Sequence, residues 1–243
     1  MFDLRGKRAL VTGSTQGIGK AIAAMLCRQG AAVVIHGATS AEKCRQAAAE
    51  MPGPTDTAVV DLSLSGSADT LYALTGDVDI LVLNASIQYR KHWDEITEQE
   101  FDTQVNCNFK SSLMLAQKYA PAMKRNGWGR ILMIGSVQQY KPHVDMAAYA
   151  ATKCAQMSLV SNLAKQLAPF GITVNNLAPG VIETPRNDAA LNDPEYHRKI
   201  MAGIPAGFAG KSEDCASPAL LLCSEEGRYM TGIDLIVDGG MHL

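Results

Sequence analysis

Tyr149 and Lys153, with Ser136 upstream, are the residues whose types and spacing fit a chemical role most closely. On an α-helix, positions four apart share one face, so the phenol and the ammonium would project together. A phenol titrates near pH ~10, but a positive charge within ~4–6 Å favours its ionised form. Ser136 would hydrogen-bond a substrate oxygen beside the phenol. Tyrosine and lysine at this spacing also occur where the lysine side chain only covers a half-buried ring. The rest of the chain is therefore needed to choose between this interpretation and the catalytic one.

Alternating apolar runs and helical patterns must bring these three residues together. The apolar runs predict seven strands, at residues 8–12, 32–36, 58–60, 79–83, 130–134, 172–177 and 233–237. Helical patterns lie between them, the longest at 98–125 and 147–167, and Ser40 and Ser212 are predicted N-caps of two others. Strands that are apolar throughout indicate a parallel sheet covered on both faces.

The predicted fold class is therefore α/β, with a seven-stranded parallel sheet and helices on both faces. Right-handed crossovers make it a doubly wound Rossmann fold. No repeat, linker or low-complexity tract divides the 243 residues, which predicts one domain over 1–243. The segment 183–209 is polar and interrupted by prolines, and we expect it to form a lid over the substrate.

Composition excludes several classes of function. A net charge of -2 without a basic run gives no reason to expect nucleic acid or an anionic membrane as a partner. No stretch approaches the ~20 apolar residues of a membrane span, and the N-terminus has no apolar signal core. Six scattered cysteines without a C-x-x-C pair indicate reduced thiols, so we expect a cytoplasmic protein. The five histidines lack ligand spacing, and no metal site is predicted.

Gly13, Gly17 and Gly19 follow the first predicted strand and open the first helix. Glycine allows a tight turn and a close approach of the backbone to a pyrophosphate. The helix N-terminus adds partial positive charge aimed at phosphates. In a doubly wound sheet, ligands bind beyond the carboxyl ends of the strands, so this turn predicts dinucleotide binding. The spacing is G-x-x-x-G-x-G, and glycines that only make a turn are the alternative.

Together these features resemble the short-chain dehydrogenase/reductase family over nearly the whole chain. The compact members are the most similar, among them 3-oxoacyl-carrier-protein reductases and sugar or steroid dehydrogenases. The resemblance is carried, in order, by the segments 12–19, 61–62, 84–85, Asn108, Ser136, Tyr149-x-x-x-Lys153, 176–180 and 238–240. One departure is Ser86, which stands where the family usually has glycine.

The resemblance implies a set of cofactor contacts. The glycine loop would contribute Gly13, Ser14, Gln16, Gly17, Ile18 and Gly19. The adenosine would meet Asp61, Leu62, Asn84 and Ala85, and the nicotinamide half would meet Tyr149, Lys153, Pro179, Gly180, Ile182 and Thr184. Taken in isolation, Asp61 is more often a helix cap and Thr184 more often a loop hydroxyl.

The end of the second predicted strand bears on the choice between NADP and NAD. An acidic residue there would hydrogen-bond the ribose 2′-hydroxyl and repel a 2′-phosphate. The segment 36–40 has no carboxylate, but the basic residue of many NADP-dependent relatives is also missing. Thr39 and Ser40 could accept a phosphate through hydroxyl and backbone groups, so the sequence favours NADP and leaves NAD open.

The predicted activity is an oxidoreductase that moves a hydride between NAD(P)(H) and the carbonyl or alcohol carbon of a small substrate. Tyr149 would be the general acid/base, Lys153 would poise it, and Ser136 would hold the substrate oxygen. By resemblance Asn108 would hold a water that links Lys153 to solvent, with Asn106 competing for that role. Candidate substrate residues are Gln138, His143 and Arg186, and a cation-rich set of loops hints at a polar or anionic substrate.

Apolar residues cover more of the two long helices than one sheet-facing stripe requires, which predicts a homotetramer, with a homodimer as the alternative. A non-catalytic dinucleotide-binding redox sensor is the main rival function. A sensor has no need of the serine, tyrosine and lysine together. Extended epimerases or dehydratases carry the Tyr-x-x-x-Lys pair but add a larger C-terminal domain, and a methyltransferase has no use for that pair.

Overall fold

The computed structural model describes the backbone of residues 1–243 and the side chains of all of them except residues 189 and 190. Its centre is a seven-stranded sheet in the order β3-β2-β1-β4-β5-β6-β7, in which every neighbouring pair is parallel. The strands are β1 Arg8–Val11, β2 Ala32–Gly37, β3 Thr55–Val59, β4 Ile80–Leu83, β5 Gly129–Ile134, β6 Ile172–Pro179 and β7 Asp234–Val237. The predicted doubly wound α/β fold is confirmed.

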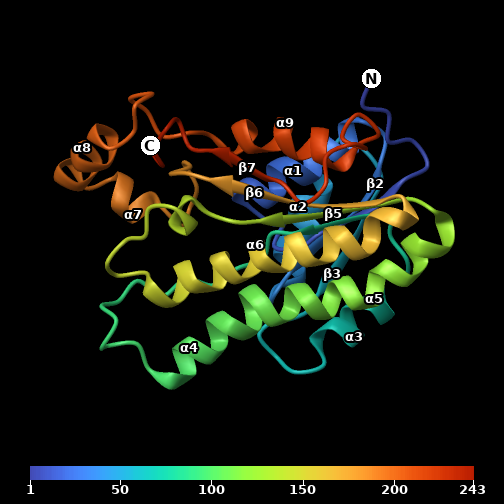
Figure 1. Ribbon diagram of the computed structural model, residues 1–243, viewed down its shortest axis with the longest axis horizontal. Helices are drawn as coiled ribbons and strands as arrows, with labels where there is room; N and C mark the ends of the chain where they lie inside the picture. Colours follow the sequence, from blue (N-terminus) through green and yellow to red (C-terminus); the bar gives the residue numbers. More distant parts are fainter.

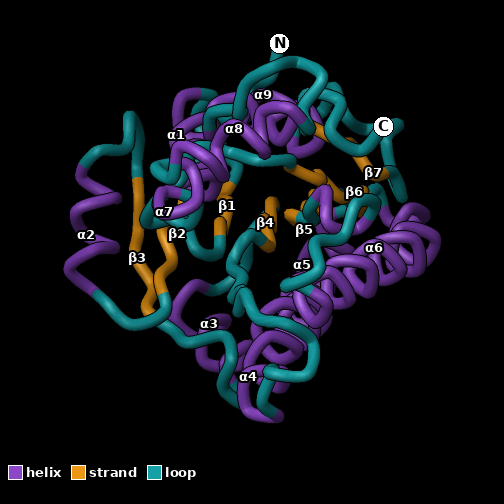
Figure 2. Tube along the Cα trace, turned by 90° about the vertical axis from the view of Figure 1, so that its left-hand side faces the viewer, coloured by secondary structure: helices purple, strands orange, loops and turns teal.

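Helices cover both faces of this sheet, as Figures 1 and 2 show. The first face carries α1 Gly17–Arg28 and α9 Ser212–Cys223, with α2 Ala41–Ala49 beside β3 at the edge. The second face carries α3 Ser67–Thr75, α5 Ser111–Asn126 and α6 Ala147–Leu167. α4 Glu98–Gln104 leads into α5 and lies below the sheet in the same view.

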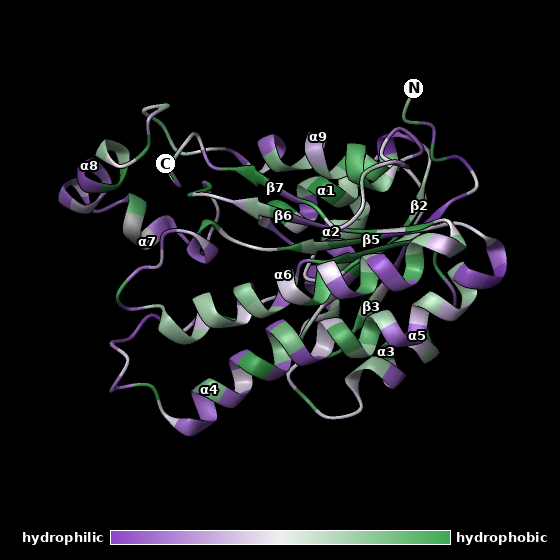
Figure 3. Ribbon diagram, viewed as in Figure 1, coloured by the Kyte–Doolittle hydropathy of each residue, from purple (hydrophilic) through white to green (hydrophobic). Residues whose placement is uncertain are grey.

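Two hydrophobic cores follow from the alternation of side chains along each strand. Ala9 and Val11 of β1 pack against α1 and α9, whereas Leu10 between them packs on the side of α5 and α6. Figure 3 shows the strands in hydrophobic colours, with polar residues on the outer sides of the helices. Because both faces of the strands are buried, the strand sequences do not alternate between polar and apolar residues.

Two predicted boundaries are wrong for identifiable reasons, and one predicted cap is confirmed. β3 begins at Thr55, three residues before the predicted run, because this edge strand carries polar residues that hide its start. Ser212 is the first residue of α9, and the cap is Lys211, whose backbone N–H is bonded by the Asp214 side chain. Ser40 does cap α2, since its hydroxyl accepts a hydrogen bond from the Lys43 N–H at 3.2 Å.

The helical pattern predicted at 98–125 is not one regular helix. A wider π-helical turn, η1 Val105–Lys110, separates α4 from α5. A π-turn inserts one residue without changing the composition, so periodicity alone does not reveal it. Asn108 lies in this turn.

The segment 183–209 lies beyond the carboxyl ends of the strands and contains two short helices, α7 Asp188–Leu191 and α8 Pro194–Ala202 (Figure 1). Asp193 begins α8 by accepting hydrogen bonds from the backbone N–H groups of Glu195 and Tyr196, both at 2.9 Å. Within the described residues, no helix has the length and apolar character that a bilayer crossing requires.

Candidate active site

A cavity of about 1000 Å³ opens at the carboxyl ends of β1, β4, β5 and β6. The chain winds from β1 toward β3 in one direction and from β4 toward β7 in the other, so the strand order reverses between β1 and β4. Loops diverge at such a point and leave a crevice. The glycine turn, the loop after β4 and the segment after β6 meet in this one cavity.

Gly13, Gly17 and Gly19 all line the cavity, and each is required locally. Gly13 and Gly17 have φ angles of 64° and 57°, in the left-handed region that favours glycine. A Cβ on Gly19 would overlap the Asn84 amide and the Gly13 carbonyl. The start of α1 can therefore approach the strand ends closely, which leaves backbone N–H groups to face a bound pyrophosphate.

His36, at the end of β2, is hydrogen-bonded to the glycine turn. Its Nδ1 accepts a hydrogen bond from the Gly13 N–H at 3.1 Å, and its Nε2 lies 3.0 Å from the Val60 carbonyl oxygen. This pair of contacts fixes the neutral tautomer with hydrogen on Nε2. Burial lowers the pKa of His36 to about 4. No sequence pattern indicated this contact between His36 and the glycine turn.

Asn84 and Thr12 join the ends of β1 and β4. The Thr12 hydroxyl oxygen accepts hydrogen bonds from the backbone N–H groups of Asn84 and Ala85, at 2.9 and 3.0 Å. The Asn84 amide donates to the Thr12 and Gly13 carbonyl oxygens at 2.9 and 3.0 Å. Asn84 and Ala85 both line the cavity. The Asn84 side chain thus forms part of the cavity wall and holds the ends of β1 and β4 together.

The other predicted nucleotide residues divide into two groups. Gln16, Ile18, Asp61 and Leu62 line the cavity, as do Pro179, Gly180, Ile182 and Thr184 after β6. Thr39 and Ser14 are not among the lining residues, and the Ser14 hydroxyl instead accepts a hydrogen bond from the His36 N–H at 3.0 Å. Along the described lining, the stretch from the glycine turn to Ala38 contributes no lysine or arginine.

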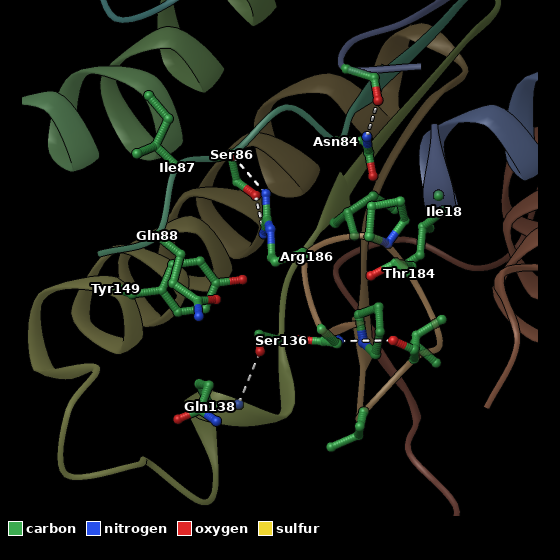
Figure 4. Close-up of a pocket in the computed structure, with 18 of the residues that line it drawn as sticks. Ile18, Asn84, Ser86, Ile87, Gln88, Ser136, Gln138, Tyr149, Thr184 and Arg186 are labelled. Carbon is green, nitrogen blue, oxygen red and sulfur yellow. Dashed lines mark hydrogen bonds between the residues drawn. The ribbon is translucent and has the colours of Figure 1, made fainter. Parts of the chain in front are cut away.

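Tyr149 and Lys153 lie on the first turns of α6 and line the cavity. Figure 4 shows the Tyr149 side chain in this pocket. The Lys153 Nζ is 5.5 Å from the centre of the Tyr149 ring. It donates hydrogen bonds to the Ile134 carbonyl oxygen at 2.7 Å and to the Gln156 Oε1 at 2.9 Å. Both side chains are buried, and the predicted convergence of phenol and ammonium at one wall is present.

Lys153 does not carry the fixed charge that the sequence suggested. Burial, and then the positive charge of Arg186, lower the pKa of Lys153 to about 7. A lysine ammonium with that pKa changes its charge near neutral pH, and a neighbouring negative charge would favour its protonated form. The state of Lys153 is therefore coupled to what binds beside it.

Ser136 stands at the end of β5 and faces the same space (Figure 4). Its Oγ accepts a hydrogen bond from the Gln138 N–H at 3.2 Å, which leaves the hydroxyl hydrogen available to a substrate oxygen. Its backbone N–H donates to the Gln139 Oε1 at 2.9 Å, and the Gln139 amide in turn donates to Asp234 on β7. Ser136 is thus held in place by residues outside the cavity.

Asn108 lies behind this wall and is fully buried. Its Oδ1 accepts a hydrogen bond from the Ile87 N–H at 2.8 Å, and its Nδ2 donates to the Ile87 carbonyl oxygen and the Thr152 Oγ1 at 2.9 and 3.1 Å. Both amide atoms are therefore used within the protein. Asn108 ties the loop after β4 to α6.

Ser86 has a partner that the sequence did not indicate. The Arg186 guanidinium donates to the Ser86 hydroxyl and carbonyl oxygens, at 2.9 and 2.7 Å (Figure 4). Arg186 follows β6 and Ser86 follows β4, so the pair spans the cavity. Ser86, which stands where the family usually has glycine, therefore accepts hydrogen bonds from an arginine.

The predicted substrate residues Gln138, His143 and Arg186 all line the cavity. The cavity is also lined by Arg90, Lys141, Tyr196 and Lys199, which no sequence pattern singled out. No spacing rule connects these positions, because they come from separate loops and from α8. Among the described residues, no cluster of three or more histidine, cysteine or acidic side chains could hold a metal ion.

The fold and the site together define a class of protein, a Rossmann-type oxidoreductase that binds a nicotinamide dinucleotide at the switch point of its sheet. The family described as enoyl-(acyl carrier protein) reductase matches residues 13–242. The 3-oxoacyl-[acyl-carrier-protein] reductase FabG of Aquifex aeolicus is 35% identical, over 99% of both chains.

Solved structures agree with this class. A 3-oxoacyl (acyl-carrier-protein) reductase from Agrobacterium tumefaciens with NADP bound is 36% identical, with a TM-score of 0.92 over 98% of this chain and 95% of that chain. A gluconate 5-dehydrogenase from Burkholderia cenocepacia, in complex with NADP and tartrate, is 35% identical, with a TM-score of 0.90 over 99% and 96%. The chain belongs to the short-chain dehydrogenase/reductase family and is an NAD(P)-dependent oxidoreductase.

Proposed function

We propose that the protein reduces the carbonyl group of a small substrate with NADPH, or oxidises the corresponding alcohol with NADP, at the site formed by Ser136, Tyr149 and Lys153. The observation that carries the proposal is the convergence of these three side chains on one cavity that also receives the glycine turn. The bound nicotinamide supplies or accepts the hydride.

The protein's residues supply position and the proton. In the reductive direction the Tyr149 hydroxyl donates its proton to the substrate oxygen, and the Ser136 hydroxyl donates a hydrogen bond to the same oxygen. The Lys153 ammonium stabilises the phenolate that remains on Tyr149. Asn108, predicted to hold a water, contributes in this proposal by fixing the loop after β4 against α6, since both of its amide atoms are bonded there.

The residues around the cavity fit a dinucleotide. The positive-φ glycines and the close approach of α1 leave room for a pyrophosphate where side chains would block it. The segment 36–40 at the end of β2 has no carboxylate to repel a 2′-phosphate, which supports NADP over NAD, and the solved relatives named above contain NADP. Thr39, Ser14 and the predicted lining residues remain proposed cofactor contacts.

Further parts of the proposal concern organisation. The whole chain acts as one domain, with residues 183–209 as the lid over the substrate. It assembles as a homotetramer, or failing that a homodimer, and works in the cytoplasm. The rival function, a non-catalytic redox sensor, has no support among the relatives named above, which are reductases and dehydrogenases.

The proposal is tested by following NAD(P)H absorbance with a panel of ketones, keto acids, sugars and acyl thioesters, with each cofactor in turn. We expect substrate-dependent oxidation of NADPH that exceeds the rate with NADH by about tenfold or more at equal cofactor concentration, because the segment 36–40 at the end of β2 has no carboxylate to repel a 2′-phosphate. Cofactor binding without turnover of any carbonyl would instead favour the sensor.

A further inference from the structure

Arg90 joins three segments that surround the outer end of the cavity. Its Nη2 lies 2.5 Å from the Tyr196 Oη on α8 and 3.2 Å from the His143 Nε2 on the loop before α6. Its guanidinium carbon lies 4.7 Å from the centre of the Tyr196 ring. Next to it, the Lys91 N–H donates to the Asp145 carbonyl oxygen at 2.9 Å. The guanidinium is therefore held in orientation before any substrate arrives.

One edge of this guanidinium is available to a ligand. Nη1 makes no hydrogen bond to any described residue, and the nearest carboxylate oxygen, Asp145 Oδ2, is 3.8 Å from Nε, beyond hydrogen-bonding distance. An arginine carries five N–H donors in a planar fork that fits the two oxygens of a carboxylate. Arg90 thus presents donors to the cavity.

The lysines and arginines that line the cavity come from segments outside the glycine turn. The lining cations are Arg90, Lys141, Arg186 and Lys199, together with the catalytic Lys153. They lie with Gln138 and Tyr196, whereas the described lining from the glycine turn to Ala38 has none. Asp193 lines the cavity as well, and Asp145 forms an ion pair with Arg90 at 3.8 Å. The four cations Arg90, Lys141, Arg186 and Lys199 outnumber these two carboxylates.

The His143 ring faces a donor at each of its two nitrogens. Its Nδ1 faces the Asp145 N–H at 3.1 Å, and its Nε2 faces the Arg90 Nη2 at 3.2 Å. Burial and the nearby charges of Arg90 and Lys199 lower the pKa of His143, which keeps the ring neutral. A neutral imidazole has one acceptor nitrogen, so it cannot accept from both donors. An anion beside Arg90 would accept from Nε2–H, while Nδ1 accepted from Asp145.

We propose that the outer end of the cavity binds a carboxylate of the substrate, with Arg90 as its main ligand and His143 and Lys199 beside it. The inference rests on the proposed function, and it narrows the substrate to hydroxy or oxo carboxylic acids small enough to reach from Arg90 to Ser136 and Tyr149. Arg90 is a specificity-determining residue in this account, and the hydride and proton transfers remain with the catalytic residues.

The test is calorimetric titration of the NADP complex with gluconate and tartrate, each compared with its neutral amide. We expect the wild type to bind at least one acid about tenfold or more tightly than its amide, and Arg90→Met to lose that preference. Lys199→Met, an exposed substitution on α8, should reduce the preference by about threefold. The matched control is Arg198→Met, which removes the same charge from the same helix outside the cavity lining and should leave the preference unchanged.

Binding of acid and amide with equal affinity, no binding of either acid, or equal losses in Arg90→Met and Arg198→Met, would overturn the inference. Unchanged turnover of acetoacetyl-coenzyme A by Arg90→Met, with no preference for acids, would point to an acyl thioester and overturn it as well. These results remain separate from the proposed function, because Tyr149-dependent turnover of a neutral ketone would persist if only the carboxylate site were wrong. If Arg90→Met fails to bind NADPH or to fold, Lys199→Met and Arg198→Met still decide the question.

Discussion

His36 illustrates how one buried side chain sets the geometry of the glycine turn. It accepts from the Gly13 N–H through one ring nitrogen, and the other lies against Val60. Protonation would put hydrogen on both nitrogens and break the contact with Gly13. Folding therefore requires the neutral ring, and burial lowers its pKa from 6.5 to about 4.

The pH dependence of stability follows from that difference. As the pH falls below 6.5, the unfolded chain binds a proton at His36 that the native state does not bind until about pH 4. Stability is therefore lost as the pH falls from 7 to 4, by about 3 kcal/mol from this residue. His36→Asn keeps an acceptor for the Gly13 N–H but does not titrate, so its unfolding free energy, measured in urea from pH 7 to pH 4, should fall less steeply by that amount. Parallel curves for the two proteins would contradict this role.

The sequence predicted the site residues whose spacing along one helix brings them together. It missed the residues that meet only through tertiary contacts between distant segments. Tyr149 and Lys153 are one helical turn apart, so their meeting follows from helix geometry. Arg90 and Tyr196 are separated by 106 positions and meet only because α8 lies over the loop after β4. The Ser86–Arg186 pair is of the same kind. Ser86 was noticed as a departure, but nothing in the chain indicated its partner.

Among the elements, the π-helical turn between α4 and α5 has a defined task. It brings Asn108 against Ile87 and Thr152, so that one amide joins the loop after β4 to α6. π-turns within helices occur frequently at functional sites. The sequence predicted a helix here and identified Asn108, but the widened turn depends on tertiary contacts that a helical period does not record.

Asn108→Ala should therefore lower the unfolding free energy by about 2 kcal/mol or more, because the Ile87 N–H and carbonyl oxygen lose their partners in the interior. Asn106 is the matched control in the same turn. It is partly exposed, and its side chain makes no hydrogen bond among the described residues, so Asn106→Ala should cost well under 1 kcal/mol. Urea denaturation of both variants at pH 7 makes the comparison. Equal losses of unfolding free energy in the two variants would contradict a stabilising role of the Asn108 hydrogen bonds.

For the other helices and strands, the prediction is most accurate where the hydrophobic pattern is clearest. The fully buried strands β1, β4 and β5 were placed within one or two residues, because continuous apolar runs mark them. The edge strand β3 was predicted short because only its last residues are apolar. The helices α7 and α8 were not predicted, since the segment 183–209 is polar and broken by prolines.

The predicted catalytic and cofactor residues of the molecule gather at one edge of the sheet, on the loops that follow the strands and on the first turns of α6 (Figure 1). A parallel sheet achieves this because the carboxyl ends of all its strands point the same way. The doubly wound parallel sheet and this location follow from the sequence pattern. The positions of the segment 183–209 and of the outer cations do not, because they depend on side-chain contacts between distant segments.

The outer face of α6 bears on assembly. Met157, Leu159 and Leu163 on this helix are only partly buried, and Cys154 is exposed. An apolar face of this kind is more stable when another subunit covers it. Light scattering at micromolar concentration should therefore give about four times the chain mass of 26.0 kDa, or twice that mass if the assembly stops at a dimer. A monomer at that concentration would contradict the proposed assembly.

The central claim is that the Tyr149 hydroxyl transfers the proton that accompanies hydride transfer. Among the described residues this hydroxyl makes no hydrogen bond, so Tyr149→Phe removes the proton donor and leaves the surrounding contacts in place. The direct measurement is the single-turnover rate of NADPH oxidation with a carbonyl substrate, taken beside the NADPH affinity of the same variant. We predict a rate at least about 100-fold below wild type with NADPH affinity within about threefold. A rate close to wild type in a variant that binds NADPH normally would contradict the account.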